Sequence, residues 1–471
     1  MGLSLGALPG LGCSIAMAIA LPFTFGWDPM VAVFLFTGMM GAEAFGGAIP
    51  AILLNTPGTS VNAATCFDGF PMTRRGEAGK AIGIAALSSG MGAIFGLIVL
   101  LISIPIVRSI LFLFGPPEIF MVILFGIVAI AVAARGNILK GLLSGSIGIL
   151  ISLIGLSPVF GILRFNFGSD YLYDGIQLIP VFIGLFAVSQ VIDYWAKGGS
   201  IVAEGVTGDL GGVREGFKEV FRHKLCFLRS SAIGTIVGII PGVGGSVANL
   251  LSYVAAMQSS SYPERFGTGL PEGVIAAEAS NNASYLGAFL PTIAFGIPGS
   301  VMMAVVLGMF IFHGLTPGPL FFRDHMDLVF AILMGMTLGN AFSTTVGIIG
   351  AKYLAKLATI RVVYIAPVIS VLCVTGAFAV RQNIWDVILT LIAGIFGYAM
   401  VRFGFSVICL VIGYILGTLA ENSFYQSLAI AYGSYRIFFS RPISLVLFIL
   451  LIIVLLLPFI RKREGSNHKE L

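Results

Sequence analysis

Two segments of the chain place proline, glycine and hydroxyl residues in an order that suits the binding of an anion. They are GAIPAILLNTPGTSV (Gly47 to Val61) and AFLPTIAFGIPGSV (Ala288 to Val301), and in both, two prolines stand seven residues apart, the second followed by Gly and a hydroxyl residue. If the second Pro-Gly pair breaks a membrane helix, a new helix begins behind it, and its free N–H groups and positive dipole end can hold carboxylate oxygens. A Pro-Gly pair that merely kinks a helix is the structural alternative. The predicted substrate-binding residues are Asn55, Thr56, Pro57, Gly58, Thr59, Ser60, Pro298, Gly299 and Ser300.

Oxygen-bearing side chains near the same breaks suit the binding of a cation. Backbone carbonyls freed at a break, together with neutral amide and hydroxyl oxygens, are ligands that Na⁺ can use. Two carboxylates that stand in otherwise apolar segments also belong to this set. A charged side chain at mid-bilayer costs on the order of 3 kcal/mol and needs a partner or a water-filled cavity. Helix capping, pairing with a loop arginine, or hydrogen bonding between helices is the structural alternative. The predicted cation-coupling residues are Asn62, Asn281, Asn282, Ser284, Glu43 and Glu278.

The composition excludes most other classes of protein. Of the 471 residues, 58% are apolar and 10% are charged, whereas a soluble domain carries roughly 25% charged residues. Lipid must therefore solvate much of the surface. The five cysteines and four histidines show no metal-type spacing and no HExxH motif, so we expect no catalytic residue, no cofactor and no metal other than a coupling Na⁺.

Apolar runs long enough to cross about 30 Å of hydrocarbon define the expected elements. The predicted fold is an all-α polytopic membrane protein with two inverted-topology repeats, about 11 membrane-spanning helices and two broken re-entrant helical hairpins. The predicted crossings are residues 3–21, 81–104, 118–134, 139–156, 175–195, 230–256, 326–350, 362–378, 384–400, 403–421 and 443–460. The predicted units are a first membrane repeat 1–195 with hairpin 30–71, a charged cytoplasmic linker 196–229, a second repeat 230–460 with hairpin 273–312, and a basic cytoplasmic tail 461–471.

A second pair of matching motifs supports the repeat. ALPGLG (Ala7 to Gly12) precedes the first segment and IIPGVGG (Ile239 to Gly245) precedes the second, so paired motifs occur in the same order in both halves. Repeats interrupted by Gly and Pro at corresponding points are typical of secondary transporters whose site lies between the halves.

Basic residues predict the orientation of the chain. The tail RKREGSNHKEL, the linker, and the loops around Arg74 and Lys356 are all placed in the cytoplasm by the positive-inside rule. Counting crossings from the tail makes the first hairpin enter from the cytoplasm and the second from outside. We therefore expect a multi-pass protein of the cell (inner) membrane with a cytoplasmic C-terminus.

Two long signatures resemble a known family. AIPAILLNTPGTSVNAATCFDGFPMTRRGEAGKAIG and PEGVIAAEASNNASYLGAFLPTIAFGIPGSVMMAVVLGMFIFHGLTPGP are similar to the signature regions of the large membrane subunit of the tripartite tricarboxylate transporters, the TctA family. The resemblance covers nearly the whole chain. One departure is the short stretch before ALPGLG, from which we expect an incomplete first helix.

The resemblance implies an importer of citrate-like or other carboxylates that is coupled to a cation, with Na⁺ expected and H⁺ as the alternative. It also implies two partners, a small four-helix membrane subunit and an extracytoplasmic solute-binding protein, and no nucleic acid. Alternating access with the two hairpins moving together as an elevator is the expected mechanism. A stand-alone carboxylate permease is the alternative within transport, and a channel or an intramembrane enzyme is the alternative from another class.

Overall fold

Helices make up most of the chain, and the computed structural model describes residues 1–8, 12–111, 113–133, 138–197, 211–318, 320–360 and 362–467. Most of the predicted linker before residue 211, Pro9 to Leu11 of the ALPGLG motif and the end of the basic tail lie outside these ranges. Two short strands, β1 (Gly155–Leu156) and β2 (Leu163–Arg164), pair antiparallel.

Within the described residues, seven helices are long and apolar enough to cross a membrane, and shorter apolar helices accompany them. The prediction of an all-α membrane protein is confirmed at this level. The seven candidate spans are Pro29–Leu54, Ala78–Leu111, Leu178–Ala196, Met326–Leu357, Tyr364–Arg381, Ile384–Arg402 and Val407–Ile430.

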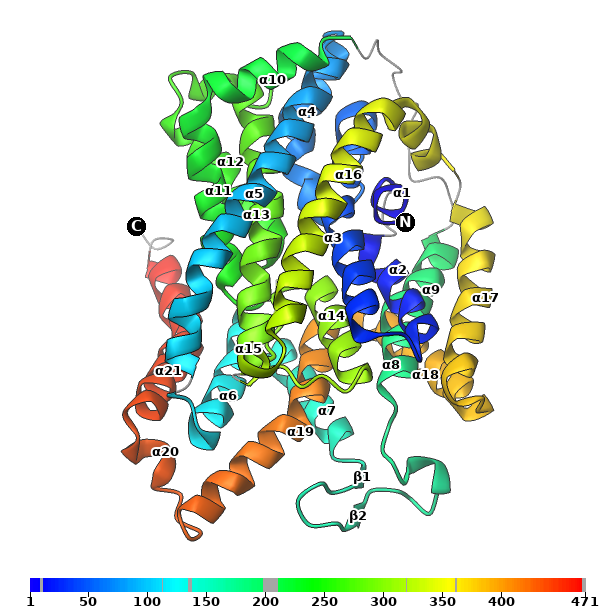
Figure 1. Cartoon of the computed structure of the whole chain (residues 1–471), viewed down its shortest axis with the longest axis vertical. Helices are drawn as coiled ribbons and strands as arrows, with labels where there is room; N and C mark the ends of the chain where they lie inside the picture. Colours follow the sequence, from blue (N-terminus) through cyan, green and yellow to red (C-terminus); the bar gives the residue numbers. More distant parts are fainter. Residues whose placement is uncertain are drawn as a thin grey trace.

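The helices form two groups, the upper and lower parts of Figure 1. One cluster of buried apolar side chains lies within the upper group, and a larger cluster joins the lower group to α2, α14 and parts of α3, α5, α13 and α16. The upper group holds α1 (Gly2–Gly6), α3 (Pro29–Leu54), α4 (Ala63–Arg74), α5 (Ala78–Leu111), α10 (Val213–Arg222), α11 (Lys224–Ile239), α12 (Gly244–Ser259), α13 (Pro271–Phe295) and α16 (Met326–Ala358). The lower group holds α6 (Pro116–Ala133), α7 (Ile138–Ser152), α8 (Leu178–Phe182), α9 (Ser189–Lys197), α15 (Phe321–Asp324), α17 (Val362–Arg381), α18 (Ile384–Arg402), α19 (Val407–Ile430), α20 (Ile437–Ser440) and α21 (Pro442–Asn467).

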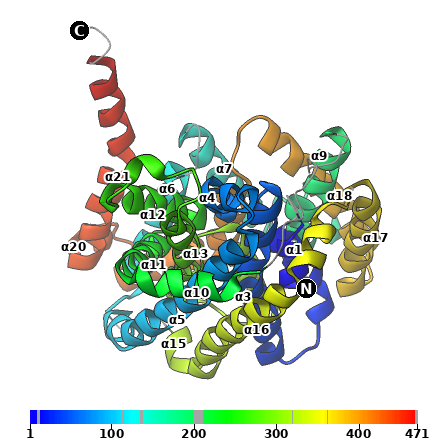
Figure 2. The same ribbon diagram turned by 90° about the horizontal axis from the view of Figure 1, so that it is seen from above.

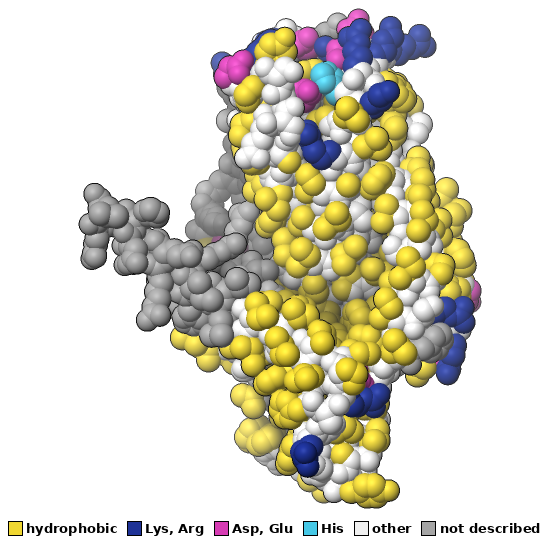
Figure 3. Space-filling model, turned by 90° about the vertical axis from the view of Figure 1, so that its left-hand side faces the viewer, with side chains coloured by type: hydrophobic (Ala, Val, Ile, Leu, Met, Phe, Trp, Pro, Cys, Tyr) yellow, Lys and Arg dark blue, Asp and Glu magenta, His cyan; other side chains and the backbone are white. Residues whose placement is uncertain are grey.

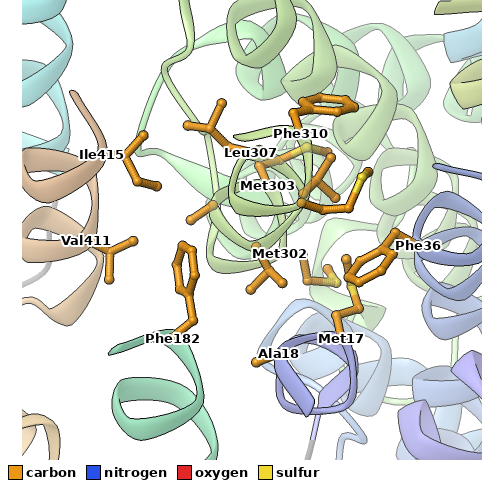
Figure 4. Close-up of a cluster of buried hydrophobic side chains, with 14 of the residues drawn as sticks. Met17, Ala18, Phe36, Phe182, Met302, Met303, Leu307, Phe310, Val411 and Ile415 are labelled. Atoms are coloured by element: carbon orange, nitrogen blue, oxygen red, sulfur yellow. The ribbon is translucent and has the colours of Figure 1, made fainter. Parts of the chain in front are cut away.

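Helix α14 (Val301–Phe312) lies where the two groups meet, and α2 (Gly12–Ala20) packs against it. Both are apolar on all sides, which is typical of a helix buried among others. Seen along the vertical axis of Figure 1, the groups form one bundle from which α21 projects (Figure 2). Figure 4 shows Met302, Met303, Leu307 and Phe310 of α14 among Met17 and Ala18 of α2, Phe36 of α3, Phe182 of α8, and Val411 and Ile415 of α19.

Charged side chains gather at the upper end of the molecule, above a broad apolar belt (Figure 3). The basic turn between α4 and α5, helix α10 and the end of α16 all lie near that end (Figure 1). The turn with Arg74, the described part of the linker and the end of α16, which the positive-inside rule assigns to one compartment, therefore share one end of the fold, whereas the end of α21 lies at mid-height in Figure 1.

Residues 30–71 cross the bundle instead of folding back as a re-entrant hairpin. Asp28 caps α3 by accepting a hydrogen bond from the Met30 N–H at 2.7 Å. After α3 ends, the loop returns along it, and Asn62 Nδ2 donates to the Ala44 carbonyl at 3.0 Å. Helix α4 then resumes the original direction, because Thr73 Oγ1 at its other end donates to the Ile52 carbonyl at 2.8 Å. The prediction that both ends of this segment lie on one side is wrong.

Residues 273–312 are built in the same way. After α13 ends, the chain runs back alongside this helix. Gly299 comes so close to it that an added Cβ would lie 3.2 Å from the Ala288 Cβ. Helix α14 then runs back toward the end of α13, where the Gly318 N–H donates to the Ile293 carbonyl at 2.8 Å. This segment also crosses rather than re-enters, and it runs from the upper to the lower end, opposite to α3 and α4 (Figure 1).

In the second half of the chain, a helical hairpin is formed by α11 and α12. It lies where a continuous crossing, 230–256, was predicted. Helix α11 runs beside α13 with Gly234 against Ser280 and Gly238 against Ser284. The chain turns at Ile240–Val243, and α12 returns, with Ser252 Oγ donating to the Ser230 carbonyl at 3.2 Å. The predicted crossing 3–21 is interrupted too, because it consists of α1 and α2. The loop 313–325 lies at the end of the fold opposite α10 (Figure 1).

Part of the predicted linker is the amphipathic helix α10, which packs on α5. Val220 is buried, and Lys80 of α5 pairs with Glu219 at 3.1 Å. Phe221 and Leu225 are exposed.

Candidate functional site

Among the described residues, three broken helix pairs, α3–α4, α11–α12 and α13–α14, meet the start of α2 at a cavity of about 1000 Å³. Each of these three breaks carries a Pro-Gly motif found in the sequence, and Pro9 and Gly10 before α2 lie outside the described residues. Of the predicted substrate residues, Pro57, Gly58, Thr59, Ser60, Gly299 and Ser300 line the cavity. Asn55, Thr56 and Pro298 are outside this lining, although they belong to the same two loops.

Two of the breaks have nearly the same backbone geometry. Helix α3 ends at Asn55 with φ 52°, and α13 ends at Gly296 with φ 68°, both in the left-handed region. The next N–H in each loop donates to the carbonyl of the proline inside the preceding helix, Thr56 to Pro50 at 3.3 Å and Ile297 to Pro291 at 3.2 Å. Such a left-handed residue ends a helix by satisfying its last carbonyls.

The loops are held close to their neighbours through glycine. The Gly58 N–H donates to the Gly47 carbonyl at 3.1 Å, and a Cβ on Gly58 would overlap the carbonyl oxygen of Gly6. Only glycine therefore fits at this point. At the equivalent Gly299 the nearest atom to an added Cβ is 3.2 Å away, which leaves more room.

Helix N-termini point toward the cavity from several sides. Ser300 is extended and its Oγ accepts from the Met303 N–H at 3.3 Å at the start of α14. Thr59 precedes the short 3₁₀ turn Ser60–Asn62, which leads into α4, and its hydroxyl donates to Asn62 Oδ1 at 2.7 Å. Residues at the start of α2 and α12 line the cavity as well. Free N–H groups at such ends attract anions.

Two parts of the cavity wall were missed by the sequence analysis. One is the turn Gly404–Ser406 before α19, where Ser406 Oγ accepts from the Cys409 N–H at 3.3 Å. The other is the π-helix Ile183–Val188 with Ser189 and Gln190 behind it. Neither belongs to a repeated motif, so no spacing signal could have found it. The ALPGLG and IIPGVGG motifs indicate the starts of α2 and α12, but the hydropathy of the sequence predicts continuous crossings there.

Glu43 is the one charged side chain among the described residues that line the cavity. The Cys13 N–H donates to its Oε1 at 3.0 Å, and Tyr285 Oη donates to its Oε2 at 3.0 Å. Both carboxylate oxygens therefore have a partner. Tyr285 itself lines the cavity.

Glu278 lies deeper, outside the cavity lining, and is fully buried. Its Oε1 accepts from Asn62 Nδ2 at 3.2 Å and from Thr65 Oγ1 at 2.5 Å. Its Oε2 is buried without a hydrogen-bond partner, as are Oδ1 of Asn281 and Oδ1 of Asn282. Residues three and four apart lie on one helix face, so α13 presents three unpartnered oxygens on a single face.

The remaining predicted cation ligand, Ser284, is buried, and its hydroxyl oxygen keeps its lone pairs. Its Oγ donates to the Asn281 carbonyl at 2.7 Å. Asp68, the third carboxylate in apolar text, has a structural role. It accepts from the N–H groups of Gly267, Gly269 and Leu270 at 2.7 to 3.0 Å and from Tyr253 Oη at 2.8 Å. It therefore fastens α4 to the loop between α12 and α13.

Within the part of the chain that the structure describes, no group of three or more His, Cys, Asp or Glu residues could hold a metal ion.

Comparison with known proteins identifies the family. The model of the tripartite tricarboxylate transporter TctA family matches residues 1–412. The chain belongs to this family. Membership implies the large membrane subunit of a tricarboxylate transporter. The resemblance that the two signatures indicated is confirmed.

Two relatives come from Agrobacterium vitis. An uncharacterized 52.8 kDa protein in the TAR-I ttuC' 3'region is 32% identical over 474 residues, covering 100% of this chain and 94% of the relative. An uncharacterized protein in the TAR-II ttuC' 3'region is 32% identical over 240 residues, covering 50% of this chain and 99% of the relative. No solved structure matches the chain.

Proposed function

We propose that this TctA-family chain imports tricarboxylates or related carboxylates by alternating access, with Na⁺ as the coupling ion and the cavity as the binding site. The observation that carries the proposal is the convergence of three Pro-Gly breaks and the start of α2 on one cavity in a chain of a tricarboxylate transporter family.

Substrate binding is assigned to the helix ends. Among the described residues no Lys or Arg side chain lines the cavity, so a carboxylate there must be held by N–H groups, hydroxyls and helix dipoles. The hydroxyls of Thr59, Ser60 and Ser300 and the amide groups around Gly58 and Gly299 are suitably placed. Glycine at both positions allows a ligand to approach the backbone closely.

The Na⁺ site is assigned to the face of α13 that carries Glu278, Asn281 and Asn282. Three buried oxygens without hydrogen bonds are costly unless another partner reaches them, and a hard monovalent cation would supply that partner. Asn62 and Thr65 hold the Glu278 carboxylate in place. Because Asn62 follows the Thr59–Ser60 loop directly, an ion at Glu278 would order the loop that lines the cavity and so favour substrate binding.

We propose that the halves form an inverted repeat and that the upper group moves as one body. The opposite directions of α3–α4 and α13–α14 support the first point (Figure 1). The Asp68 contacts between the halves support the second. An elevator movement of this group past the lower helices would expose the cavity to each side in turn.

The partners are a small four-helix membrane subunit and an extracytoplasmic solute-binding protein, and the location is the cell (inner) membrane with the C-terminus in the cytoplasm. Support comes from the family and from the gathering of basic segments at one end. A stand-alone permease is the competing proposal.

Reconstitution separates the two. The chain is placed in proteoliposomes, the small subunit and the binding protein are added in turn, and uptake of labelled citrate and several dicarboxylates is followed with and without an inward Na⁺ gradient. Uptake that needs both partners and the gradient is the expected result. Uptake by the chain alone would support the permease, and gradient-independent flux would contradict secondary transport.

A further inference from the structure

Glu43 occupies a place in the cavity that the Na⁺ site does not explain. It is the one charged side chain among the described lining residues, and it shares the cavity with the helix ends assigned to the anion. Like charges in one low-dielectric site disfavour each other strongly. An ionised Glu43 would therefore oppose the binding of a substrate that carries two or three negative charges.

The hydrogen bonds of Glu43 distinguish it from Glu278. Glu278 has a bare oxygen, whereas both oxygens of Glu43 are occupied by the Cys13 N–H and Tyr285 Oη. Each oxygen of Glu43 has one donor and keeps a second lone pair. The partner on Oε2 suits a proton there, because a tyrosine hydroxyl can donate to a carboxylate and can turn to accept from a carboxylic acid. The site therefore suits both protonation states of Glu43.

We propose that Glu43 binds one proton together with the substrate, so that transport carries H⁺ in addition to Na⁺. This rests on the proposed function. The proton comes from the solution on the side of entry, resides on Oε2 while Tyr285 accepts its hydrogen bond, and leaves to the other side after the substrate has gone. Protonation removes one negative charge from the cavity at the step that adds the anion.

The surroundings contain few other groups that could titrate in its place. Tyr285 of α13 and the Cys13 thiol of α2 are the titratable groups that face Glu43, and Glu278 lies farther along α13. On the side of α1, Glu43 lies against Gly6. In this proposal Glu278 binds the coupling cation and Glu43 binds the proton.

The test follows proton movement directly. Proteoliposomes with the partner subunits contain a pH-sensitive dye, and a dicarboxylate that stays fully ionised over the pH range is supplied with an inward Na⁺ gradient. Substrate-driven acidification of the interior is expected for the natural chain and for E421Q, a matched control whose buried carboxylate pairs with Arg164 at 2.8 Å outside the cavity. E43Q should lose the acidification, and its remaining uptake should no longer vary with pH.

Y285F provides a second test that does not depend on the folding of E43Q. Y285F removes the hydroxyl that changes role, and it should shift the midpoint of the pH dependence while uptake stays Na⁺-dependent. Acidification by E43Q equal to that of the natural chain, or Na⁺-driven uptake by the natural chain without any acidification, would overturn the proton assignment and leave Na⁺-coupled transport standing. Absence of Na⁺-driven uptake in the natural chain would instead refute the proposed function.

Discussion

Asn62 Nδ2 donates to Glu278 Oε1 at 3.2 Å and so joins the two broken crossings at their centre. The other oxygen of this carboxylate, Oε2, is buried without a hydrogen-bond partner. A neutral amide thus positions one oxygen and leaves the second free for an ion.

Replacing this carboxylate should remove the dependence on Na⁺. In E278Q the amide keeps the shape of the side chain but loses the charge that attracts the cation, so the Na⁺ concentration for half-maximal uptake should rise at least tenfold, equivalent to about 1.4 kcal/mol. Initial uptake rates over a series of Na⁺ concentrations measure this. E421Q serves as the control, and an unchanged Na⁺ dependence in E278Q would remove Glu278 from the ion site.

The two loop glycines should respond differently to the same substitution. G58A should prevent correct folding, because the new Cβ would overlap the Gly6 carbonyl oxygen. G299A should fold, since its Cβ would lie 3.2 Å from Ala288 Cβ, and should raise the KM for the carboxylate about tenfold by crowding the backbone amides.

Size-exclusion profiles and uptake kinetics distinguish the two effects. G350A is the matched control, because a Cβ on Gly350 of α16 meets nothing within 4 Å. An unaltered KM in folded G299A would argue against a substrate contact at this loop.

Asp68 should matter for stability more than for affinity. D68N keeps the size of the side chain but weakens four hydrogen bonds to a buried carboxylate, which should lower the free energy of unfolding by on the order of 3 kcal/mol. Thermal unfolding in detergent measures the loss. D324N alters an exposed pair with Arg323 and should leave the melting temperature unchanged; equal melting of D68N and the natural chain would show that the clamp contributes nothing.

The contact between the moving and the stationary groups offers a test of the elevator. A Cβ on Gly126 of α6 would meet the side chain of Ile297 in the loop before α14. The double variant G126C/I297C should form a cross-link under oxidation that stops uptake, and reduction should restore it. Transport that continues with the cross-link fully formed would mean that these two groups do not move apart.

Much of the fold could be predicted from the sequence because hydropathy and the paired Pro-Gly motifs are local signals. Most apolar runs correspond to observed helices, and both the Pro57-Gly58 and Pro298-Gly299 breaks occur where expected. The direction of the chain after each break could not be predicted. Whether α4 continues or reverses α3 depends on contacts such as Thr73 with Ile52, which no periodicity reveals.

The candidate site could be predicted in part for the same reason. Glu43 and Glu278 stand out equally as carboxylates in apolar text, yet one lines the cavity and the other lies beneath it. That difference arises from the packing of α13 against α3 and α4. The turn Gly404–Ser406 reaches the cavity from a part of the chain without any repeated motif, so only the tertiary structure brings it to the site.

Protection of a single cysteine tests the central claim, that the cavity binds the carboxylate. The natural cysteines are all buried, and Ser60 is an exposed residue of the cavity wall, so S60C provides one reactive thiol; S440C on α20 is the control outside the cavity. The rate of modification by a charged thiol reagent is measured with and without citrate, in Na⁺ and in K⁺. Slower modification of S60C, and not of S440C, when citrate and Na⁺ are both present is the predicted result. Equal rates for S60C under all conditions, with uptake intact in the natural chain, would contradict a carboxylate site in this cavity.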